Sequence, residues 1–85
     1  MKTMTLVISL QGMGLNEIQA LKVRNAIEAL IESNDSVEVV GAGVNLDGSE
    51  IDLEIETSDV EGASSFIEEL MASADLEGRY KLETK

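Results

Sequence analysis

The chain has 85 residues, no cysteine, no histidine, and a formal net charge of −11 from seventeen acidic and six basic residues. This length suits one hydrophobic core, so we expect a single domain over residues 1–85. Because the chain has no thiol or imidazole group, disulfides, thiolate metal sites and most nucleophilic or histidine-based catalysis are excluded. The negative field repels nucleic acid and anionic membranes and attracts basic partners.

The first third of the chain predicts a strand followed by a helix. Apolar and polar residues alternate over residues 3–11, which indicates a half-buried strand rather than a signal peptide, so a cytoplasmic protein is the default expectation. Asn16 followed by Gln19 fits a capping box that opens a helix over about 15–33. We expect Asn34 to end this helix in a left-handed conformation. The predicted apolar stripe consists of Ile18, Leu21, Val23, Ala26, Ile27, Leu30 and Ile31.

Two strands follow, joined by a short turn. Valine-rich residues 36–44 predict a strand, but Gly41 and Gly43 interrupt its alternation, so we expect a bulge near Gly41. Residues 45–49 contain Asp47-Gly48, which is typical of a hairpin connection. Residues 50–56 then alternate strictly between acidic and apolar side chains, which predicts an antiparallel strand with one face buried.

The last third predicts a second helix and a short strand. Ser58 followed by Glu61 fits another capping box, and Gly78 is placed to stop the helix. Residues 79–83 alternate again, with Tyr80 and Leu82 expected to point inward. The apolar side of this helix consists of Val60, Ala63, Phe66, Ile67, Leu70, Met71 and Ala74.

The element order is therefore β-α-β-β-α-β. Two amphipathic helices and four half-apolar strands are satisfied when both helices cover one face of a four-stranded antiparallel sheet. Right-handed crossovers give the spatial strand order 4-1-3-2. This pattern resembles the ferredoxin-like α+β fold over essentially the whole chain, a fold that hosts many unrelated functions.

The candidate site is the acidic side of residues 50–56. Glu50, Asp52, Glu54 and Glu56 share the face opposite the core, with Glu38 and Val40 expected beside them on the neighbouring strand. We call the row of Glu50, Asp52, Glu54 and Glu56 the acidic ladder. It can be a solvated sheet face whose charges prevent aggregation, or a surface that binds a basic partner. Both interpretations are left open by the residues alone.

Two loops invite more specific interpretations. Gly12-Met13-Gly14 lacks the third glycine and the basic residue of a phosphate loop, because Glu17 stands where that glycine belongs. With Leu15, it resembles the small-ligand loop of ACT regulatory domains, which implies ligand sensing or dimerisation through Gly12, Gly14 and Leu15. Residues 45–54 imitate part of a calcium loop, but Gly43 replaces its first aspartate and strands flank it, so we expect no EF-hand.

The leading hypothesis is a non-catalytic protein without a cofactor or metal. Val-x-Gly-x-Gly followed by Gly-x-x-Ile-Asp-Leu-x-Ile-Glu, between Val39 and Glu56, is similar to small acidic immunity and phage anti-defence inhibitor proteins. That resemblance implies docking on a basic protein or nucleoprotein surface, with no direct binding of nucleic acid or membrane. Carboxylates about 7 Å apart along a strand approach the spacing of successive phosphates, so nucleic-acid mimicry is physically reasonable. A homodimer is left open.

Overall fold

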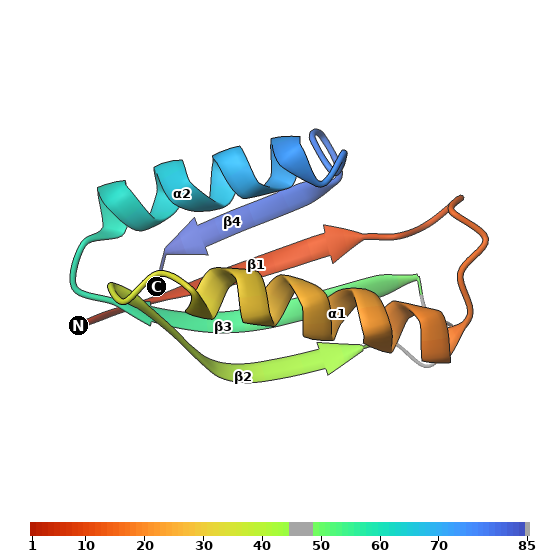
Figure 1. Cartoon of the computed structure of the whole chain (residues 1–85), viewed down its shortest axis with the longest axis horizontal. Coiled ribbons are helices and arrows are strands. Elements are labelled where there is room, and N and C mark those ends of the chain that lie inside the picture. The colour runs from red at the N-terminus through yellow and green to blue at the C-terminus, as the bar shows by residue number, and fades with distance from the viewer. Residues whose placement is uncertain (45–48, 85) are drawn as a thin grey trace.

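The computed structural model describes residues 1–44 and 49–84. In chain order these residues form β1 (Lys2–Ser9), α1 (Glu17–Glu32), β2 (Val37–Val44), β3 (Glu50–Thr57), α2 (Val60–Ser73) and β4 (Tyr80–Thr84). The strands form one antiparallel sheet in the order β2-β3-β1-β4, and the two helices lie on one side of it (Figure 1). This is the predicted ferredoxin-like α+β fold, and its strand order is 4-1-3-2 read from the other edge.

The core lies between the sheet and the helices. The two central strands, β1 and β3, send every second side chain into it, as their alternating sequences require. Both helices add small and branched side chains along a narrow stripe. The strand residues are Met4, Leu6, Ile8, Ile51, Leu53 and Ile55, each 0% exposed, and the helix residues are Ala20, Ile27, Ile31, Ala63, Ile67 and Met71.

Helix α1 begins as predicted but buries less of its surface than expected. Asn16 caps it, accepting a hydrogen bond from the Gln19 amide at 2.8 Å while the Gln19 side chain accepts one from the Asn16 amide at 3.0 Å. The predicted apolar stripe was too broad, although its Ile27 and Ile31 are buried and its Val23 packs against the core. Ala20, Ile27 and Ile31 are buried, whereas Ala26 is exposed and the larger Ile18, Leu21 and Leu30 are 67%, 40% and 48% exposed. A helix lying on a sheet buries only the residues nearest one line along its axis, and these four lie away from that line.

The end of α1 also differs from its prediction. Ser33 closes the helix with ordinary right-handed angles, and Asn34 is not left-handed. The Asn34 side chain instead accepts a hydrogen bond from the Ser36 amide at 2.9 Å, while its carbonyl accepts one from Val37 at 3.1 Å. Asparagine makes such local turns readily, because its short side chain reaches the backbone two residues ahead.

Helix α2 uses different residues at both ends from those predicted. Asp59, not Ser58, is the N-cap and accepts a hydrogen bond from the Gly62 amide at 3.1 Å. At the other end Asp75 takes the left-handed conformation with φ 61°, ahead of Gly78. The Leu76 amide donates to the Met71 carbonyl and the Asp75 amide to that of Ala72, which is the Schellman arrangement. Gly78, with φ 80°, serves the next turn, before β4.

Strand β2 contains the predicted bulge. Val39 pairs with Ile55 and Gly41 pairs with Glu54, so Val40 is an extra residue between them. The extra residue restores the alternation, since Val37 and Val39 precede it on the core face and Ala42 and Val44 follow on the same face, opposite Leu53 and Ile51. The Asp47-Gly48 turn predicted between β2 and β3 lies outside the described residues, but the antiparallel pairing it was expected to produce is present.

Candidate functional site

The predicted acidic ladder lies on the side of the sheet opposite the helices. Along β3 the residues facing the core are buried, and those between them are exposed or half-buried. Both helices occupy the other side, so no helix of the described chain covers these carboxylates (Figure 1). We define the outer acidic face as the carboxylates on this side of the sheet: Glu38, Glu50, Asp52, Glu54, Glu56 and Glu83.

The strand register brings all five predicted residues together. Glu50, Asp52, Glu54 and Glu56 follow one another along β3, about 7 Å apart by strand geometry. Glu38 of β2 pairs directly with Glu56. Opposed residues on neighbouring antiparallel strands have Cβ atoms about 5 Å apart, and like charges in that position destabilise a sheet. The fold therefore places charges where they oppose folding.

One glycine of β2 leaves room for an acidic side chain of β3. Gly43 pairs with Asp52, and a Cβ added to Gly43 would lie 2.9 Å from Asp52 Oδ1. Gly41 pairs with Glu54, and its added Cβ would lie 3.6 Å from the Glu54 Cβ and 3.9 Å from Oε2. The Asp52 carboxylate thus lies where a side chain at Gly43 would begin, whereas the distances at Gly41 are ordinary van der Waals contacts. Sequence reasoning assigned both glycines to the bulge alone and missed that Gly43 makes space for Asp52.

Strand β1 forms a lower strip beside the acidic ladder. Its outward residues Thr3, Thr5, Val7 and Ser9 pair with Glu56, Glu54, Asp52 and Glu50 in that order, and all four are half-buried. The Thr5 hydroxyl oxygen is buried and has no hydrogen-bond partner among the described residues. The outward side chains of β1 are therefore short, and the longer acidic side chains of β3 extend further from the sheet beside them.

One corner of the same face is basic. Arg79 and Lys81 approach it from β4, where a hollow of about 390 Å³ is lined by Val7, Ser9, Glu50, Gly78, Arg79, Tyr80 and Lys81. The Arg79 guanidinium turns toward the loop between β1 and α1 and donates to the Gln11 carbonyl at 2.9 Å. The charge on this side of the sheet is thus divided, with acids along β3, Arg79 just before β4 and Lys81 near its start.

The structure adds one residue to the predicted site. Glu83 pairs with Thr5, which itself pairs with Glu54, so a carboxylate of β4 lies two strands from the ladder. The sequence contained the signal for this position, because alternate residues of a strand share a face and Glu83 follows Lys81 by two residues. Val40, which was expected beside Glu38, is the bulged residue between Val39 and Gly41, and it is 47% exposed.

The chemistry open to the outer acidic face is binding through charge and hydrogen bonds. Among residues 1–44 and 49–84, no three of the acidic side chains converge closely enough to hold a metal ion. In the same ranges, neither α1 nor α2 is long and apolar enough to cross a membrane. The geometry offers a row of hydrogen-bond acceptors that can receive several basic side chains at once.

The glycine loop after β1 is well separated in sequence from the acidic strand. Gly12 and Gly14 have φ values of 85° and 72°, and a Cβ added to either would have no atom within 4 Å, so they serve the turn itself. Leu15 is half-buried and packs against the core. Met13 between the glycines is 42% exposed. The loop is therefore an exposed turn anchored by Leu15.

Comparison of the chain with protein-family models, curated proteins and solved structures found no match to any of them.

Proposed function

We propose that this chain is a non-catalytic acidic protein that acts by docking its outer acidic face on a basic, nucleic-acid-binding surface of another protein. The observation that carries the proposal is the direct pairing of Glu38 with Glu56 beside the row of four carboxylates on β3. These like charges weaken the sheet that holds them. A solvated face needs only scattered charges, and a cationic partner turns the same crowding into favourable interactions.

Nucleic-acid mimicry is the specific form of this proposal. A partner that binds nucleic acid carries Lys and Arg side chains arranged for phosphates. The ladder presents carboxylates about 7 Å apart along β3, a spacing close to that of phosphates along one strand of nucleic acid. The low strip of β1 leaves the flank of the ladder accessible to long basic side chains. The resemblance to acidic immunity and anti-defence inhibitors supports the same role.

The test begins with capture of partners on the immobilised chain at low salt. A variant that combines Glu50→Lys, Asp52→Lys, Glu54→Lys and Glu56→Lys serves as the control. We expect a basic protein that the wild-type chain retains, that elevated salt releases, and that the variant does not retain. Short duplex DNA or RNA should then compete with the chain for the purified partner. Retention of the same proteins by both chains would contradict the proposal.

A ligand-sensing or dimerising module is the second candidate, favoured by one observation. Exposed apolar side chains lie in and just after the glycine loop: Met13, Ile18 and Leu21 are 42%, 67% and 40% exposed. A dimer contact through this loop would cover them, as the ACT-like resemblance of Gly12, Gly14 and Leu15 implies. Thermal stabilisation by an amino acid, or a dimer abolished by Ile18→Lys, would favour this candidate over docking through the outer acidic face.

A further inference from the structure

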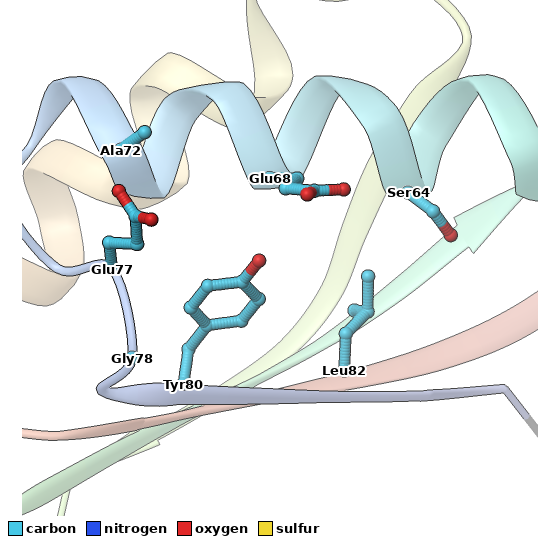
Figure 2. A pocket seen from close by; sticks show the side chains of 7 residues that line it. All are labelled: Ser64, Glu68, Ala72, Glu77, Gly78, Tyr80 and Leu82. Carbon is cyan, nitrogen blue, oxygen red and sulfur yellow. The ribbon is translucent and has the colours of Figure 1, made fainter.

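A second surface lies on the helix side of the sheet, between α2 and the edge strand β4. Here a cavity of about 580 Å³ is lined by Ser64, Glu68, Ala72, Glu77, Gly78, Tyr80 and Leu82. Figure 2 shows Tyr80 and Leu82 rising from β4 toward α2, with Ser64, Glu68 and Ala72 along the helix above them. This volume falls within the range of pockets that hold ligands. We call this space the α2–β4 groove.

The edge of β4 beside the groove has backbone groups available for another strand. The Ser9 amide donates to the Arg79 carbonyl at 2.7 Å, so Arg79 directs this carbonyl toward β1, while its own amide donates to the Leu76 carbonyl at 3.0 Å. Backbone direction alternates along an antiparallel strand. The backbone N–H and C=O groups of Lys81 and Glu83 therefore point toward β1, whereas those of Tyr80 and Leu82 point to the free edge. The residues whose side chains line the groove are thus the residues whose backbone can pair outward.

The other edge of the described sheet is less suited to an added strand. Strand β2 forms that edge, and its register shifts between Val39 and Gly41. A bulge twists an edge and interrupts its pattern of hydrogen bonds, which discourages pairing with a further strand. Strand β4 pairs with β1 over five consecutive residues without such a shift. Of the two edges, β4 is the one that can accept an extended peptide in register.

The lining of the groove specifies a cationic occupant. Glu68 and Glu77 are both exposed, and none of the lining residues is basic. In Figure 2 the Tyr80 ring lies below the helix between these two carboxylates. A Lys or Arg side chain there would meet two negative charges and an aromatic ring, whose face attracts cations. The small Ser64 and Ala72 leave space for its aliphatic part.

We propose that the α2–β4 groove binds an extended basic peptide segment as a fifth, antiparallel strand paired with β4. Its Lys or Arg residues would stand opposite Tyr80 and Leu82, with their side chains in the groove and their backbone groups bonded to the edge. This is strand addition, in which backbone hydrogen bonds give affinity and alternate side chains give specificity. The groove lies on the helix side, so this proposal stands or falls separately from the outer acidic face.

The antiparallel geometry dictates a decisive pair of probe peptides. Opposed residues of an antiparallel pair place their side chains on the same face, and they exchange both backbone bonds only where their N–H and C=O groups point toward each other, as those of Tyr80 and Leu82 would point toward an added strand. In a capped heptapeptide alternating threonine and lysine, the lysine N–H groups would therefore face β4 and the threonine N–H groups would face solvent. One probe is N-methylated on every lysine, the other on every threonine. They match in charge and amino-acid sequence and differ by one N-methyl group.

Binding is followed by the amide NMR signals of the full chain during titration with each peptide. We expect the unmethylated and threonine-methylated peptides to shift the signals of Tyr80, Leu82 and Ser64, and the lysine-methylated peptide to leave them unchanged. The double variant Glu68→Gln with Glu77→Gln should bind about threefold to tenfold more weakly, as loss of two exposed ion pairs implies. The control Glu32→Gln with Glu61→Gln changes net charge equally and should bind like wild type.

Three results would overturn the proposal. The first is equal binding of the two methylated peptides, which would exclude backbone pairing with β4. The second is a set of shifts confined to the outward residues of β1 and β3, which would place the peptide on the outer acidic face. The third is movement of the β4 signals on dilution of the protein alone, which would assign the edge to a second copy of this chain.

Discussion

The two faces of β3 share one backbone and have opposite effects on stability. Ile51, Leu53 and Ile55 are completely buried and hold the helices against the sheet. The acids between them lie on the other side, where Glu56 directly opposes Glu38. Burial of the apolar face stabilises the fold by burying hydrocarbon, whereas crowding of the acidic face works against it. Stability therefore depends on one face of the strand, and we propose that function depends on the other.

The largest expected effect comes from opening a cavity on the buried face. Leu53 is 0% exposed at the centre of the sheet, between Leu6 of β1 and Ala42 of β2. Leu53→Ala should lower the free energy of unfolding by about 2–5 kcal/mol, which combines lost hydrophobic transfer with the cavity left behind. Domains of this kind have only about 5–15 kcal/mol in total. Urea denaturation monitored by circular dichroism measures the loss, and a change below about 1 kcal/mol would contradict the assigned core.

A smaller loss of unfolding free energy is expected at Thr57, the polar residue at the end of the buried face of β3. Thr57 is 0% exposed, and its hydroxyl donates to the Ser36 carbonyl at 2.9 Å and accepts from the Asp59 amide at 3.1 Å. Thr57→Val keeps the shape and removes both bonds, which leaves Asp59, the cap of α2, without that partner. We expect a loss of about 1–3 kcal/mol in the same denaturation assay, with Thr57→Ser retaining most of the stability. Equal losses in both variants would assign the effect to packing instead.

The smallest expected effect is a gain in the free energy of unfolding, from a substitution on the acidic face. Glu56→Lys replaces the like-charged Glu38–Glu56 pair with an opposite-charged one, so we expect the free energy of unfolding to rise by about 0.2–1 kcal/mol. The gain should shrink with added salt, because salt screens exposed charges. Glu69→Lys makes the same change of net charge on an exposed site of α2 and controls for the overall field. A loss of stability in Glu56→Lys alone would mean that the two carboxylates are not crowded.

The sequence predicted the structural features that depend on local patterns of residues, including the two faces of β3. Strict alternation over residues 50–56 was enough to assign each side chain of β3 to its face, and Asn16 with Gln19 was enough to place the start of α1. Gly41 and Gly43 indicated the bulge, because they interrupt an otherwise regular pattern. The acidic site needed only these local signals together with the strand order.

Features that depend on tertiary position were predicted less well. The exposure of Ile18, Leu21 and Leu30 reflects how α1 lies on the sheet, which its own periodicity does not determine. Asp59 and Asp75 took the end positions expected for Ser58 and Gly78, since neighbouring residues of similar capping ability compete within one turn. The α2–β4 groove combines Glu68 with Tyr80 from separate elements. Glu68 had no local signal to distinguish it from an ordinary solvated acid.

The most direct test of the acidic face separates its position from the overall charge. One variant combines Glu50→Gln, Asp52→Asn, Glu54→Gln and Glu56→Gln. Its control combines Glu32→Gln, Asp35→Asn, Glu61→Gln and Glu69→Gln, four exposed acids that lie outside the sheet. Removing four negative charges from −11 leaves −7 in both.

The measurement is the dissociation constant of each variant for the captured basic partner, at one fixed salt concentration and with its salt dependence. We predict that the β3 variant loses most of its affinity and its salt dependence, while the control binds within about threefold of wild type, as loss of distant exposed charges implies. Equal weakening of both variants would show that net charge, and not the outer acidic face, attracts the partner.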